Sequence, residues 1–335
     1  MRADTALLAL SLTLPALLAS PHPTVAAERA RLRRPARGFQ MRMGPFVVAP
    51  ASERETCEYR TLPNRNAMDA QSFELGMSEG SHHFVVWAYL GPDHDPTHFP
   101  DKMVDSPGCI GVGPRDAFNR ANLFGMQTSR GRVRFPKGIA VRLAPQQPVL
   151  LNAHYKNASL TDPLAPSLVF NIVPARRGSV KHHAESLVVG NIPDISIPPR
   201  GHGSLTAEWR APIALNVIQL SSHQHKRGTG VTIHRLDAAG NDLGEVYATQ
   251  DWQHPLEVWH ADPPMRIPQG EGFRFTCEWE NPDDKQVHFG VTTDDEMCFM
   301  TGYFYRDDES APLPRAPGCF PQGAGLLCPL ARAVR

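Results

Sequence analysis

The chain has 335 residues, enough for two domains of ordinary size. Lys and Arg together number 34, as do Asp and Glu, so no net charge favours binding to nucleic acid or to an anionic membrane. Proline is abundant, with 32 residues, and no long stretch of helical periodicity follows the N-terminal region. This composition favours short strands joined by irregular connections.

Residues 1–27 are predicted to form a signal peptide. Arg2 precedes an apolar run over 6–18, and the small residues at 25–27 offer a cleavage site. The run is short for a membrane span, and no second run follows it. We therefore expect an exported protein, periplasmic or secreted, with no membrane span in its mature part. A retained N-terminal anchor is the alternative.

Two sets of strand-like runs follow a flexible lead that we expect over 28–44. The first set covers 84–87, 149–155 and 168–173, and the polar stretch 175–179 is the best candidate for a linker. The second set covers 213–220, 231–234, 273–279, 287–291 and 299–305. A tail rich in proline and glycine occupies 309–335. The sequence thus predicts an all-β protein of two consecutive jelly-roll or β-sandwich domains, 45–178 and 179–308.

Six cysteines agree with export, because an even number of cysteines in an exported chain indicates disulfides. They are Cys57, Cys109, Cys277, Cys298, Cys319 and Cys328. None forms a C-x-x-C pair, which disfavours a zinc ribbon. Spacing alone leaves their pairing open. Asn157 begins a glycosylation sequon, which has meaning only in a eukaryotic source.

Each predicted domain contains a histidine cluster followed much later by one more candidate metal ligand. The first is His82-His83 with His154, and the second is His223 and His225 with Met297. The gaps 83–154 and 225–297 are nearly equal. Imidazole suits copper, and the soft thioether favours Cu(I) over harder ions. The pattern therefore predicts two copper ions per chain with different ligand sets.

The geometry of a strand supports the second cluster better than the first. Residues i and i+2 point to one face, so His223 and His225 can reach one ion, although a polar strand end is the alternative. Adjacent residues such as His82 and His83 point to opposite faces and need a bulge or a strand end, which the preceding Gly80 and Ser81 permit.

Four further residues have plain structural alternatives. His154 by itself is typical of a core histidine, and Met297 of core packing beside a strand. The pair at 182–183 lies in the linker, and we expect it to be solvated.

The pattern as a whole resembles the copper type II, ascorbate-dependent monooxygenases. The match runs through His-His at 82–83, Asn-Ala-His-Tyr at 152–155, His-Gln-His at 223–225 and Asp-Glu-Met-Cys at 295–298, and covers roughly residues 45 to 306. The joint pattern is far more specific than any one of its parts.

This resemblance implies a function. His82, His83 and His154 would hold an electron-transfer copper, while His223, His225 and Met297 would hold the catalytic copper that meets O2. The family has two jelly-roll domains facing across a solvent-filled cleft. Ascorbate or another one-electron reductant supplies electrons, and an aliphatic C–H bond of a small molecule becomes an alcohol. The resemblance also implies disulfides Cys57–Cys109 and Cys277–Cys298, which leaves Cys319–Cys328.

Substrate-binding positions depart from the amidating members of the family. Those enzymes bind a peptide carboxylate through an arginine two residues before the His-x-His motif, and through Asn and Tyr after Met-Cys. Here the places hold Ser221, Phe299 and Thr301. A C-terminal peptide is therefore not the expected substrate, and the site is expected to be more apolar and neutral.

Two other functions compete with an oxygenase. One is a copper-binding or electron-transfer protein without turnover on the same scaffold. The other is a zinc hydrolase, which needs an activating carboxylate; Glu296 is the only feature in its favour, and methionine is a poor zinc ligand. The sequence does not specify the substrate, the physiological reductant or the oligomeric state, and it predicts no nucleic-acid partner.

Overall fold

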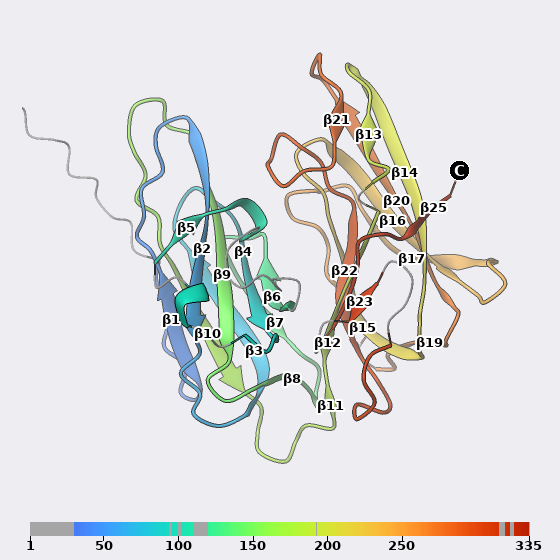
Figure 1. Cartoon of the computed structure of the whole chain (residues 1–335), viewed down its shortest axis with the longest axis horizontal. Helices are drawn as coiled ribbons and strands as arrows, with labels where there is room; N and C mark the ends of the chain where they lie inside the picture. Colours follow the sequence, from blue (N-terminus) through green and yellow to red (C-terminus); the bar gives the residue numbers. More distant parts are fainter. Residues whose placement is uncertain are drawn as a thin grey trace, which may run out of the picture.

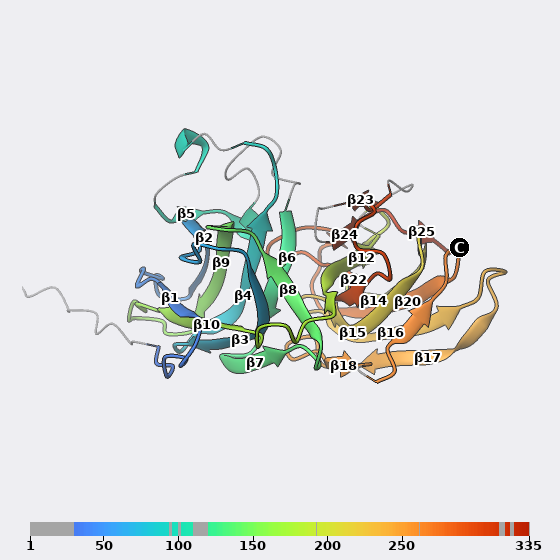
Figure 2. The ribbon, with the colours of Figure 1, turned by 90° about the horizontal axis from the view of Figure 1, so that it is seen from below.

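The computed structural model describes residues 30–93, 96–99, 102–109, 120–191, 193–260, 262–314, 319–321 and 325–334. The predicted signal peptide lies outside these residues. Within them the regular structure is almost entirely β, which confirms the predicted fold class. The strands form two sandwiches that lie side by side (Figures 1 and 2).

The first sandwich contains two sheets of mainly antiparallel strands. One sheet has the order β1 (Phe39–Met43), β10 (Leu168–Pro174), β3 (Met68–Met77), β8 (Ile139–Leu143) and β11 (His182–His183), with β7 (Arg130–Arg134) on β3. The other has the order β5 (Val104–Asp105), β2 (Ser52–Thr61), β9 (Pro148–Asn157), β4 (Ser81–Tyr89) and β6 (Arg120–Met126). Short 3-10 helices η1 (Pro96–His98) and η2 (Pro107–Cys109) lie in its loops.

The second sandwich repeats this architecture. One sheet has the order β18 (Val258–Trp259), β15 (Leu215–His223), β22 (Phe299–Tyr305), β12 (Glu185–Gly190), β24 (Gly325–Cys328) and β23 (Phe320–Pro321), with β19 (Met265–Ile267) on β15. The other has the order β17 (Asp242–Thr249), β16 (Gly228–Leu236), β20 (Gly272–Asn281), β14 (Gly201–Arg210) and β25 (Arg332–Ala333). The strands β13 (Ser196–Ile197) and β21 (Val287–His288) pair separately.

Alternation of side chains places a core between the sheets of each sandwich. In β14, Leu205, Ala207 and Trp209 are buried while their neighbours are at least partly exposed, as expected for a strand with one covered face. In β9 the residues at 149–155 are all buried, because this strand lies in the middle of its sheet and is covered on both faces where the candidate ligands gather.

The expected flexible lead is partly wrong. Within 28–44, β1 pairs with β10, and its Met41 and Met43 are buried in the first core. The strand has only three inward side chains between polar neighbours, a signal too short to read from sequence. Its partner lies more than 120 residues away in the chain.

The expected linker and tail also differ from the structure. His183 is half-buried, and its imidazole lies between the carboxylates of Glu309, 2.7 Å away, and Asp69, 3.1 Å away. The chain therefore leaves the first sandwich only after β11. In the tail, β24 pairs parallel to β12, so this segment completes the second sandwich. The predicted strand over 287–291 shrinks to β21.

All three expected disulfides are present. Cys57–Cys109 joins β2 to η2, Cys277–Cys298 joins β20 to the segment before β22, and Cys319–Cys328 closes the tail onto β24. Their Cα–Cα distances are 5.6, 6.0 and 4.0 Å.

Aromatic side chains join the two sandwiches. Phe135 of the first sandwich packs edge-on against Trp259 and Tyr303 of the second, with ring centroids 5.9 and 5.0 Å apart. The Tyr303 hydroxyl donates to the carbonyl of Leu123. The described part of the chain contains no helix with the length and hydropathy of a membrane span.

Candidate metal centres

The first candidate centre forms where β4 and β9 lie side by side. The pairing shifts by one residue at His82, because Ser81 lies opposite Tyr155 whereas His83 lies opposite His154. This is the bulge that adjacent histidines require to face one point. One nitrogen of each histidine lies within 4.8 Å of the others, and the Nδ1 atoms of His82 and His83 are 3.1 Å apart.

This donor set fits a metal ion. Two imidazole nitrogens, each about 2 Å from one ion, lie about 3 Å apart when the angle at the ion is near tetrahedral or square. Burial, followed by the neighbouring histidines, lowers the pKa of His82 to about 3. Its ring is therefore neutral at physiological pH, which is the form that binds metals.

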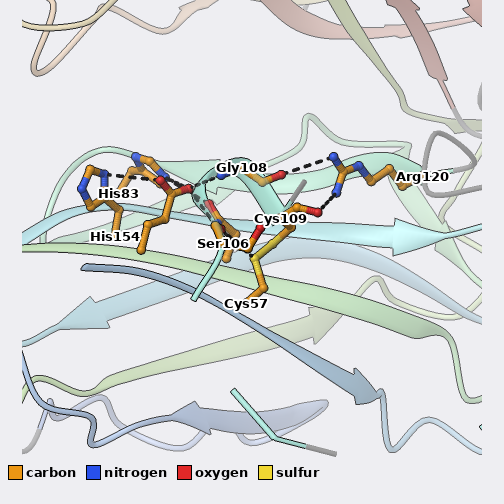
Figure 3. The surroundings of a disulfide bond; sticks show 9 residues. Cys57, His83, Ser106, Gly108, Cys109, Arg120 and His154 are labelled. Carbon is orange, nitrogen blue, oxygen red and sulfur yellow. Dashed lines mark hydrogen bonds and ion pairs between the residues drawn. A yellow bond between two sulfur atoms is a disulfide. The ribbon is translucent and has the colours of Figure 1, made fainter. Parts of the chain in front are cut away.

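Polar neighbours orient the rings of this centre. The Nε2–H of His154 donates to Glu53 (3.2 Å) and that of His83 to the side-chain carbonyl of Asn152 (3.1 Å), so that Nδ1 of both rings carries the lone pair that a metal ion requires. Asn152 in turn donates to Glu55 (2.9 Å). Figure 3 shows His83 and His154 near the Cys57–Cys109 disulfide, which joins the middle of β2 to η2.

Two carboxylates of β2 add negative charge beneath the rings. The hydrogen bond from His154 lowers the pKa of Glu53 to about 2. Burial opposes ionisation of Glu55, but its interactions with His83 also hold its pKa at about 2. Sequence reasoning missed both residues. Their i, i+2 spacing is a usable signal only once β2 is known to pair with β9.

The second candidate centre lies at the end of β15. His223 is the last residue of this strand, and His225 lies just beyond it, with ring centroids 5.2 Å apart. His225 donates from Nδ1 to the carbonyl of Asp295 (3.1 Å), which leaves Nε2 free for an ion. Burial lowers the pKa of His225 to about 4 and holds that of His223 well below its ordinary value.

The buried carboxylate of Glu296 holds Met297 next to His225. It accepts hydrogen bonds from the backbone N–H groups of His225 (3.0 Å), Met297 (3.3 Å) and Arg227 (2.8 Å). The Trp279 indole donates a fourth (3.0 Å). Its oxygens are thus engaged by N–H donors, and the side chain is inaccessible to solvent. This arrangement suits a positioning role and counts against a water-activating base.

The two centres face each other across the junction between the sandwiches. The Trp252 ring of the second sandwich lies 5.8 Å from the His82 ring of the first. In addition, His82 and His83 both contribute to the lowered pKa of His223. The structure therefore brings the three histidines of the first group together and sets His223 and His225 of the second group opposite them.

A row of side chains borders the second centre on the face of β15 and β22. Ser221 pairs with Thr301, and His223 with Phe299. Ser221 also donates to the carbonyl of Leu256 (2.7 Å). The residue after Leu256 is Glu257, an exposed carboxylate that was not foreseen from sequence. Because β18 contributes only two paired residues, no strand signal indicated that Glu257 lies here.

Comparison with known proteins supports the family assignment suggested by the pattern of candidate ligands. Residues 186–323 match the model of the copper type II ascorbate-dependent monooxygenase C-terminal domain, a stretch that includes His223, His225 and Met297. No curated protein matches the chain.

Solved structures give only weak likenesses. One is a structure of Broad Bean Stain Virus, with 11% identity, 92% of this chain and 98% of that chain covered, and a TM-score of 0.34. Another is a putative secreted protein from Parabacteroides distasonis ATCC 8503, with 10% identity, coverage of 82% and 91%, and a TM-score of 0.19. Scores this low carry no argument about fold or function.

Proposed function

We propose that the chain is an exported dicopper monooxygenase that hydroxylates an aliphatic C–H bond of a small organic substrate. O2 would be the oxidant, and ascorbate or another one-electron reductant would supply the electrons. The observation that carries the proposal is the second ligand group, which lies within the stretch matching the copper monooxygenase domain and faces a cluster of three histidines. Three disulfides are compatible with export.

Each ligand group has a distinct task in this proposal. His82, His83 and His154 would hold the electron-transfer ion through nitrogen alone. His223, His225 and Met297 would hold the ion that meets O2, since a thioether favours the reduced state required for that encounter. Copper, when bound, would supply the one-electron chemistry that reduces O2.

The surrounding residues would fix the ligands rather than react. Glu53 and Asn152 orient the rings of His154 and His83, and Asp295 fixes the tautomer of His225. Glu296 holds the backbone of His225 and Met297 in one arrangement. Pre-orientation of this kind removes the need for the ligands to reorganise during turnover.

The substrate would lie on the row formed by Ser221, Thr301 and Phe299. Ser221 is buried and neutral, so this row offers no cation at the position where a carboxylate-binding arginine would stand. A small molecule without a terminal carboxylate fits such a surface best, because desolvating an unpaired carboxylate is costly.

The test is ascorbate-driven oxygen uptake by the copper-loaded protein, with product analysis, across a panel of small aliphatic and aromatic compounds. We expect substrate-dependent uptake with one hydroxylated product per O2. Copper binding without product from any compound would instead favour a copper carrier. His223→Ala is the matched inactive control, since it removes one ligand of the second group.

A further inference from the structure

One carboxylate of the first sandwich contacts both the first candidate centre and the loop that carries Met297. Glu53 on β2 accepts the Nε2–H of His154 at 3.2 Å. The hydroxyl of Thr293, in the second sandwich, lies 2.7 and 2.8 Å from the two oxygens of the same carboxylate. The two residues are 240 positions apart in the sequence. We call this contact the Glu53–Thr293 bridge.

Thr293 belongs to the loop that carries Met297. Within this loop the Thr292 hydroxyl donates to Asp295 (2.7 Å), and the Asp295 carbonyl accepts from His225. Glu296 then ties the loop to the backbone of His225. Because the loop is internally hydrogen-bonded, the position of Thr293 constrains that of Met297.

A second contact crosses the junction at the first centre. Trp252 lies against the His82 ring, with 31° between the ring planes. Both contacts are separate from the aromatic packing of Phe135 against Trp259 and Tyr303. The sandwiches can therefore stay associated through the aromatic contacts even when the bridge is removed.

We propose that Glu53 is a positioning residue which, through Thr293, holds the Met297 loop against the first centre and keeps the two copper sites at one fixed separation. Loss of the bridge should let the loop move while both ligand groups remain intact. The inference rests on the proposed function for the identity of the metal, but not for the contact itself.

The first test uses metal-free protein, so it does not depend on copper. Thr293→Val removes the hydroxyl and keeps the shape of the side chain. We expect amide hydrogen exchange in the peptide covering 289–297 to become about fivefold faster, which corresponds to about 1 kcal/mol for one hydrogen bond. Thr229→Val, at an exposed site on β16, is the matched control and should leave this peptide unchanged.

The second test measures the separation of the sites directly. In protein loaded with Cu(II), the dipolar coupling between the two ions reports their distance by pulsed electron paramagnetic resonance. We expect one narrow distance distribution in the wild type and the Thr229→Val control. Thr293→Val should broaden it and shift it to longer distance without reducing copper content.

The outcomes separate the bridge from the function. Wild-type exchange and a wild-type distance distribution in Thr293→Val would overturn the bridge, whatever the turnover. A faster-exchanging loop in that variant supports the bridge even if the wild type shows no hydroxylation, a result that would overturn the proposed function alone.

Discussion

Met297 differs in chemistry from the other five candidate ligands. It contributes sulfur instead of nitrogen, and its backbone is held by a buried carboxylate while its side chain is only partly buried. A residue placed this way adds little to core packing, so its replacement should affect the metal more than the fold.

Replacing Met297 should therefore impair metal binding without impairing folding. Met297→Ile should fold with near wild-type stability, lose copper affinity at the second centre and show no product formation. Met297→His should retain copper but lose most hydroxylation, because nitrogen does not favour Cu(I) as sulfur does. Copper content, the Cu(II) paramagnetic spectrum and ascorbate-driven oxygen uptake check both variants. Met265→Ile on β19 is the control, and wild-type product from Met297→Ile would show that Met297 is a packing residue.

At the scale of elements, a buried ion pair joins β12 to the end of β22. Arg306 donates to Glu185 at 2.7 Å, and both side chains are less than a tenth exposed. The pair fixes the strand that enters the second sandwich to the strand that follows the Met297 loop. Removing one partner leaves an unpaired buried charge.

We therefore expect Arg306→Leu to lower the free energy of unfolding by about 3–5 kcal/mol. Arg266→Leu breaks the exposed pair with Asp307 and should cost about 1 kcal/mol or less. Chemical denaturation of the two variants measures the difference. Equal losses of unfolding free energy in the two variants would mean that burial does not increase the contribution of the Arg306–Glu185 pair to stability.

Under the proposed function, β15 and β22 would also determine which substrates are excluded. Since Ser221 and Thr301 present no cation, peptides ending in glycine should not be turned over. The check is product analysis with a panel of such peptides in the presence of copper and ascorbate. Efficient amidation would contradict the assignment of this row as the substrate surface.

At the scale of the whole molecule, the six candidate ligands predict two copper ions per chain. Metal analysis after loading and desalting should give a ratio near two, falling to one in His82→Ala. His202→Ala, which changes an exposed histidine of β14, should keep the ratio at two. A ratio near one in the wild type, unchanged in His82→Ala, would remove the first site from the proposal.

The same residues predict how the metal-free protein responds to acid. The pKa is about 3 for His82 and about 4 for His225, below the ordinary value of 6.5, so the unfolded chain binds more protons as pH falls below that value. Stability should therefore fall between pH 6.5 and 4. Glu53 and Glu55, with pKa values of about 2, extend the loss from pH 4.5 downward.

Denaturation of the metal-free protein at pH 7 and pH 5 measures this loss. His82→Asn should reduce the difference between the two pH values, whereas His202→Asn should leave it unchanged. Equal stability at both values in the wild type would mean that the buried histidines are not kept neutral by the fold.

Local sequence patterns were enough to predict part of the fold and of the chemistry of this protein. Alternating and β-branched runs predicted the strands around 149–155, 273–279 and 299–305, because a strand and its buried face are encoded within a few residues. The types and order of the histidine and methionine ligands indicated the chemistry. Resemblance to a known family supplied the disulfide pairs that spacing left open.

Tertiary structure decided what depends on partners distant in sequence. The bulge at His82 exists only because β4 pairs with β9, and Glu53 meets Thr293 across 240 positions. Glu296 looked like a possible base in sequence, yet the fold surrounds it with N–H donors and turns it into a support for Met297. Sequence gives the chemical capacity of a side chain, but which groups surround it follows from how the strands pair and pack.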